Sequence, residues 1–108
     1  MNDRELVEII RRDVIEENLK YYTGLMESNR STSGGLDDLT ILYRVLPLEM
    51  REILVRVVKR IEVDTVSNVL GILDGSSARP DYRGDFSLRY EDGQNMAGDL
   101  QDTFLSSE

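Results

Sequence analysis

The stretch from Pro47 to Leu73 constrains the fold most, because it is the longest apolar-rich segment of the chain. Proline at a first helical position is preorganised for a helix and gives up only an N–H that would be unpaired there anyway. Apolar residues then recur at steps of three and four, as on one helical face; they are Met50, Leu54, Val57, Val58 and Ile61. Gly75, just past the last apolar residue, is typical of a helix end. The stretch therefore predicts a long helix that the rest of the chain covers.

The apolar pattern within this stretch shifts after Ile61. The next positions on the same face are Asp64 and Thr65, whereas the apolar residues that follow are Val66, Val69, Leu70 and Leu73. Many alternate positions are also β-branched, so a strand competes with the helix. The well-signalled start and the length of the run favour the helix. The pattern is compatible with one long helix over 47–73 or with two helices joined near Glu62–Asp64.

The length and composition predict one globular domain over residues 1–108. The chain is 40% hydrophobic and 31% charged, which is typical of a folded protein. No apolar run approaches the roughly 20 residues of a membrane span. The opening residues Met-Asn-Asp-Arg-Glu lack the basic and apolar regions of a secretory signal. We therefore expect a cytoplasmic protein that does not enter a membrane.

The N-terminal segment predicts a helix over about 3–27. Asn2 and Glu5 have the spacing of a capping box. Two apolar stripes follow, the second shifted by one residue; they are Leu6, Val7, Ile10 and Val14, then Ile15, Leu19, Tyr22 and Met26. Such a broad apolar face fits either deep packing within one chain or a subunit interface.

The remaining segments complete a mainly α (α+β) fold, a small helical domain of three to five helices with a C-terminal β-hairpin and a short terminal helix. Turn-forming residues predict loops over 28–36 and 74–84, and apolar spacing predicts a helix over about 37–46. Alternation of Phe86, Leu88 and Tyr90 before Asp92-Gly93 predicts a hairpin over about 85–97. The last helix is expected over about 99–106, with Asp99 as its N-terminal cap.

The charge of the chain points to its partners. The net charge is −8, and residues 74–108 hold eight acids and three bases. Such a segment repels nucleic acid and anionic lipid and attracts basic proteins. The candidate partner-binding residues are Tyr82, Asp85, Glu91, Asp92, Asp99 and Asp102. The competing interpretation is that these carboxylates only cap helices, form turns and keep the chain in solution.

The residues available for catalysis are few. There is no histidine for proton transfer near neutral pH and no cysteine for thiol or zinc chemistry. We therefore expect no enzyme, no catalytic or cofactor-binding residues, no cofactor and no metal site. The C-terminal carboxylates leave one minor alternative, a metal-dependent enzyme that binds a hard cation such as calcium or magnesium. However, no stretch has the ligand spacing of a calcium loop.

Three functional hypotheses follow from these observations. The first is a small acidic, non-enzymatic interaction domain that binds or inhibits a basic protein, as an immunity protein inhibits a toxin. The second is a structural domain that forms a homodimer through the broad apolar face of the N-terminal helix. The third is the metal-dependent enzyme.

Overall fold

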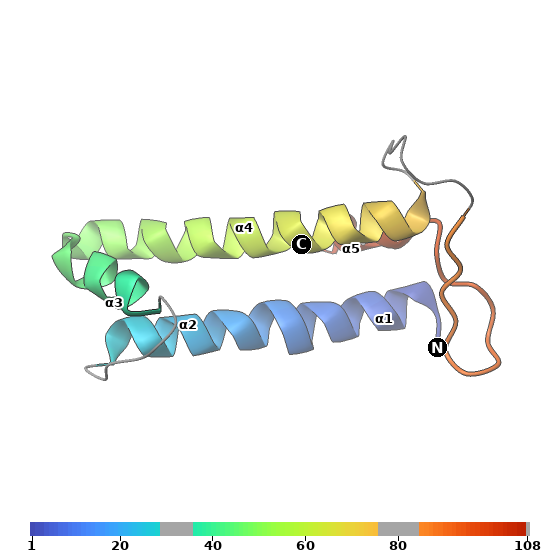
Figure 1. Ribbon diagram of the computed structural model, residues 1–108, viewed down its shortest axis with the longest axis horizontal. Coiled ribbons are helices and arrows are strands. Elements are labelled where there is room, and N and C mark those ends of the chain that lie inside the picture. The colour runs from blue at the N-terminus through green and yellow to red at the C-terminus, as the bar shows by residue number, and fades with distance from the viewer. Residues whose placement is uncertain (29–35, 76–84, 108) are drawn as a thin grey trace.

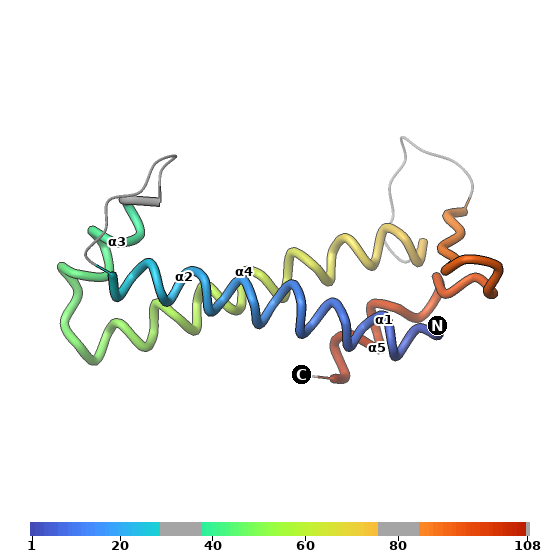
Figure 2. Tube along the Cα trace, turned by 90° about the horizontal axis from the view of Figure 1, so that it is seen from below, coloured from blue at the N-terminus to red at the C-terminus, as the bar shows by residue number. Residues whose placement is uncertain are grey.

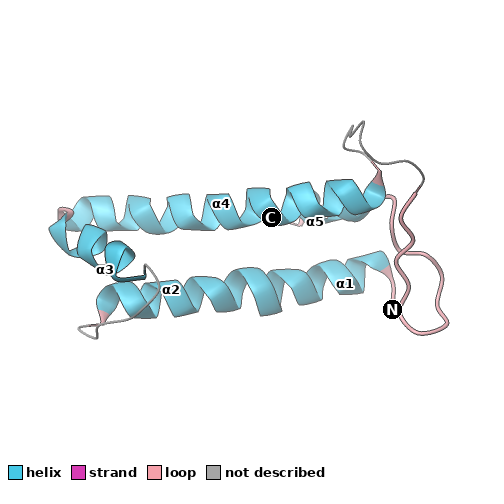
Figure 3. Ribbon diagram, in the orientation of Figure 1, coloured by secondary structure: helices cyan, strands magenta, loops and turns pink. Residues whose placement is uncertain are grey.

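A computed structural model describes residues 1–28, 36–75 and 85–107 of the chain. In chain order the helical elements are α1 (Asp3–Ile10), the π-helical segment η1 (Arg11–Glu16), α2 (Glu17–Glu27), α3 (Leu36–Val45), α4 (Leu48–Asp74) and α5 (Leu100–Ser106). No strand occurs within the described ranges (Figure 3). The helical character expected from the sequence is confirmed, and the C-terminal β-hairpin is wrong.

The first three elements form one continuous helical rod, which runs antiparallel to α4 (Figure 1). Asn2 caps the rod, because its Oδ1 accepts the Glu5 N–H at 2.9 Å. Val7 and Ile15 are both buried although they lie eight residues apart, which is about 80° out of phase in a regular α-helix. The wider turn of η1 absorbs that extra residue. The one-residue shift between the two apolar stripes therefore marks the π-helical segment.

Helix α4 is unbroken from Leu48 to Asp74. Pro47 is its N-cap rather than its first helical residue, with an extended ψ of 150°. Gly75 ends it as the sequence indicates, in the left-handed region at φ 77°, and its N–H bonds back to the last turn. The break considered near Glu62–Asp64 is absent.

The shift in the apolar pattern of α4 instead marks a change in what covers the helix. In its second half Val63 and Leu70 are buried and form one core with side chains of η1, α1 and α5; the core residues are Val7, Ile15, Val63, Leu70, Leu100 and Phe104. In its first half no described element covers the outer side. There Met50, Val57 and Ile61, which the sequence pattern assigned to the core, are 46%, 47% and 60% exposed.

Helix α5 is held in place by the end of α4. Asp74 Oδ1 accepts the N–H groups of Gly98 and Leu100 at 2.7 and 3.1 Å, and its Oδ2 accepts that of Gln101 at 2.7 Å. These N–H groups belong to the start of α5, where no intrahelical acceptor exists. Asp99, the cap expected from the sequence, makes no capping hydrogen bond. The carboxylate that caps α5 thus comes from α4.

The segment before α5 shows why the hairpin does not form. A turn is present, since the Gly93 N–H bonds to the Tyr90 carbonyl at 2.9 Å and Glu91 has a φ of 51°. Beyond the turn, Asn95 Oδ1 accepts the N–H groups of both Leu88 and Ala97, at 2.8 and 3.0 Å. Within the described residues one backbone bond joins the two arms, since the Met96 N–H donates to the Leu88 carbonyl at 2.7 Å, but the Leu88 N–H goes to the Asn95 side chain. Pairing therefore stops at a single bond, and an isolated two-stranded hairpin has little stability of its own.

Helix α3 packs on the opposite end of the molecule from α5. Thr40 is buried and its hydroxyl donates to the Leu25 carbonyl at 3.3 Å, and Arg44 donates to the Ser28 carbonyl at 2.6 Å. Figure 2 shows α3 and α5 at opposite ends and on opposite sides of the crossing pair made by the rod and α4. Among the described helices, α3 and α5 thus cover the ends of the long helices and leave their middle without a third helix.

The resulting shape is elongated. The extents are 48 × 31 × 26 Å and the radius of gyration is 17.3 Å, against about 13 Å for a compact domain of this length. None of the described helices combines the length and apolarity needed to cross a membrane. Over the middle of the long helices, between α3 and α5, no third helix lies within the described ranges.

Candidate functional site

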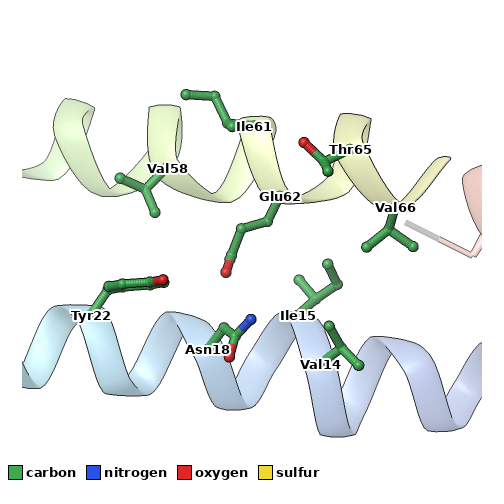
Figure 4. Close-up of a pocket in the computed structure, with 9 residues that line it drawn as sticks. All are labelled: Val14, Ile15, Asn18, Tyr22, Val58, Ile61, Glu62, Thr65 and Val66. Carbon is green, nitrogen blue, oxygen red and sulfur yellow. The ribbon is translucent and has the colours of Figure 1, made fainter. Parts of the chain in front are cut away.

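A groove runs between the rod and the middle of α4 (Figure 4). It has a volume of about 470 Å³. It is lined by side chains of η1, α2 and α4, namely Val14, Ile15, Asn18, Tyr22, Val58, Ile61, Glu62, Thr65 and Val66. Most of these are apolar or present an apolar body, so the groove suits apolar side chains of a bound molecule.

The local geometry of both helices produces this groove. In η1 the π-helical turn brings two consecutive residues, Val14 and Ile15, to the groove wall. On α4, Val58 and Val66 point toward the rod, whereas Ile61 points away from it (Figure 4). Ile61 therefore lies at the rim, where the groove meets the outer side of α4.

Glu62 is the ionisable side chain of the groove. Figure 4 shows it pointing from α4 toward Asn18 on the facing helix. Both its carboxylate oxygens are buried and lack a hydrogen bond of good geometry within the described part of the chain. Burial raises the pKa of Glu62, and the Asn18 side chain opposes that rise. An incompletely paired carboxylate in an apolar setting favours a ligand that supplies a hydrogen-bond donor or a cation.

An apolar stripe on the outside of α4 adjoins the groove. It consists of Met50, Ile53, Val57 and Ile61, which are 46%, 42%, 47% and 60% exposed. Their spacing of three, four and four residues puts them on one helical face over three turns. We name these four residues the outer stripe, and the outer stripe together with the groove the central surface. Ile61 belongs to both parts.

The second large cleft, of about 680 Å³, lies where α2, α3 and the start of α4 meet. Arg51 lines this cleft, and its guanidinium donates to the carbonyls of Leu46 and Arg44 at 3.2 and 3.1 Å. The same guanidinium lies 4.8 Å from the ring centre of Tyr43. Arg51 therefore ties α3 to α4, so its guanidinium serves the fold at this cleft.

The site residues predicted from the sequence lie elsewhere. Tyr82 is outside the described residues. The five predicted carboxylates are all exposed; they are Asp85, Glu91, Asp92, Asp99 and Asp102. Within the described ranges none of the five forms an ion pair, and no three acidic side chains are placed to hold a metal ion. The structure does not gather them into one centre.

The central surface is the feature that sequence reasoning missed. Glu62 stands between Ile61 and Val63 in the middle of the longest apolar run, and that position was the available signal. Whether the outer stripe is covered depends on the other helices, and helical spacing carries no information about them.

Comparison of the chain with models of protein families, with curated proteins and with solved structures found no match in any of the three. The central surface and the exposed carboxylates are therefore the features from which a function can be argued.

Proposed function

We propose that the protein is a non-enzymatic interaction domain that binds another protein chain through the central surface. The outer stripe is the observation that carries this proposal. Four large apolar side chains, each more than two fifths exposed, follow one another along three turns of one helix. Contiguous exposed apolar surface of this kind is typical of protein-binding sites.

The chemistry of the groove supports the same function. Its apolar walls suit inserted side chains, and Glu62 offers a carboxylate to a cation or an N–H donor. In a site of this type the apolar walls provide affinity, and the one oriented polar group fixes the orientation of the bound molecule. The absence of histidine and cysteine leaves few groups for chemistry at this place.

Site-specific photo-cross-linking tests the proposal. A photoreactive residue is placed at Val57, in the outer stripe, or at the exposed Lys20 on α2, and the full chain is produced in its native host. We expect cross-linked protein products from position 57 and none from position 20. If neither position gives a product, or if both give the same products, the central surface is not the binding site.

The exposed carboxylates favour a second candidate, a basic protein partner. Residues 85–107 hold five acids and one base, and none of the five acids is paired within the described ranges. Calorimetry with a lysine-rich peptide tests this version. We expect binding at low salt that is lost at about 0.3 M salt, and a variant with all five acids changed to amides should not bind. Equal binding by that variant contradicts it.

A further inference from the structure

We infer that a second copy of this chain covers the outer stripe, with the two α4 helices antiparallel. This inference rests on the proposed function, since it names the partner of the central surface. Two features of the molecule point to the second copy. One is the spacing of the outer stripe, which suits a two-fold pairing, and the other is the order of charges beside the stripe.

The outer stripe has the symmetry that a two-fold pairing requires. In such a pairing the same patch on each chain faces itself, so residue i contacts residue j and j contacts i. When Ile53 lies against Val57 of the second copy, Val57 lies against its Ile53. The same register places Met50 beside Ile61 of the second copy. All four stripe residues then have an apolar neighbour across the interface.

The charges beside the stripe are complementary in this register. Glu49 and Arg60 are eleven residues apart, or three turns plus about 20°, so both stand on the same edge of the stripe. In the antiparallel pairing Glu49 lies next to Arg60 of the second copy, and the contact occurs twice by symmetry. Arg60 also bonds to Asp64 of its own chain at 3.2 Å, which holds the guanidinium on this edge.

The first half of α4 fits a second copy better than it fits a basic partner. Residues 48–61 hold four bases and two acids, so this part of the surface is net positive in a chain of charge −8. A strongly basic protein would be repelled here. A second copy presents both an acid and a base in matching positions.

Sedimentation equilibrium of the purified full chain tests the inference, with Glu49→Arg, Arg60→Glu, the double variant and Val57→Glu. We expect a dimer at tens of micromolar concentration. Each single charge variant should weaken it about tenfold, because two like-charge contacts replace two attractive ones. The double variant should recover the wild-type dissociation constant to within about threefold, and Val57→Glu should give a monomer.

Lys59→Glu is the matched control. It makes the same charge change at an exposed residue that is next to Arg60 in the chain but lies on the side of α4 away from the outer stripe. It should leave the dimer unchanged. Circular dichroism establishes that each variant is folded. Any of three results overturns the inference: the wild-type chain is monomeric at all concentrations, the dimer does not respond to the substitutions, or the double variant does not restore the dimer that each single charge variant weakens. If position 57 still cross-links to another protein while the purified chain is monomeric, the proposed function stands and only the second copy is excluded.

Discussion

Asp74 caps the helix that contains Gln101, although 27 residues separate them in the chain: Oδ2 of Asp74 accepts the Gln101 N–H at 2.7 Å. The side chain of Gln101 returns to α4, where its Nε2 donates to the carbonyl and the hydroxyl of Ser67 at 3.0 and 3.1 Å. These bonds dock α5 onto α4 and bring Leu100 and Phe104 into the core.

The Asp74 cap should contribute strongly to stability. Asp74→Ala leaves three N–H groups at the start of α5 without their acceptor, so we expect a loss of about 2–3 kcal/mol in the free energy of unfolding. Urea denaturation measures it. Asp99→Ala is the control and should leave the midpoint unchanged, because Asp99 makes no capping bond. Equal losses in the two variants would show that α5 does not depend on Asp74.

Glu62 should make the stability depend on pH. Burial raises its pKa in the folded chain above the unfolded value, so the folded chain binds the proton more tightly. Its stability therefore falls as the pH rises from the unfolded pKa through the raised folded one. Glu62→Gln removes this loss, so it should be more stable than the wild type at pH 7 and equally stable at about pH 3. Denaturation across this pH range checks it, and a constant difference between the two proteins would contradict the assignment.

Arg11 should stabilise the contact between the rod and α5. Its guanidinium lies 4.4 Å from the ring centre of Phe104, and its Nη2 donates to the Phe104 carbonyl at 2.6 Å. Lysine has no planar group for this stacking, so Arg11→Lys should cost about 1–2 kcal/mol. The neighbouring Arg12→Lys provides the comparison. Arg12 is exposed and, within the described ranges, its one ion pair is with the adjacent Asp13, so the thermal midpoint of Arg12→Lys should equal that of the wild type. If Arg11→Lys does not change the thermal midpoint, the contact between Arg11 and Phe104 does not contribute to stability.

The π-helical segment leads to a prediction about deletions. Removing Asp13 from η1 leaves Val7 and Ile15 seven residues apart, which is in phase in a regular α-helix. We therefore expect this variant to fold with its helical content retained and to lose less than about 2 kcal/mol. Deleting Lys59 from α4, which has no wide turn to absorb the change, rotates the buried residues by about 100° and should unfold the chain. Circular dichroism with urea denaturation compares the two, and an unfolded Asp13 deletion would contradict this view of η1.

The sequence predicts best the features that depend on neighbouring residues. Asn2 caps the first helix and Gly75 ends α4, because each acts within a few positions along the chain. Asp99 occupies the N-cap position of α5, as the same local rule predicts, but its side chain makes no capping hydrogen bond. The carboxylate that accepts there belongs to Asp74, at the end of another helix. Capping rules that use only neighbouring residues cannot predict a capping carboxylate from another helix.

The errors in the hairpin and the core have the same origin. Alternation of Phe86, Leu88 and Tyr90 is a valid strand pattern, but the Asn95 side chain accepts the Leu88 N–H, and within the described ranges one backbone bond, from Met96 to Leu88, is all that joins the two arms. For α4, the apolar pattern predicted the helix, but it assigned Met50, Val57 and Ile61 to the core although they are exposed. Which face is covered depends on where α5 docks, so the core lies in the second half and the outer stripe stays exposed.

The docking of α5 also bears on how the chain folds as it leaves the ribosome. Arg11 and Phe104 are 93 residues apart, and Leu100 and Phe104 supply two of the six residues that form the core. The rod and α4 can form and meet earlier, yet Val63 and Leu70 keep an open side until residues 100–104 have been synthesised. On the nascent chain these side chains therefore stay exposed, along with the outer stripe, from the time they leave the ribosome until α5 has followed them. Completion of the core is the last step of folding during synthesis.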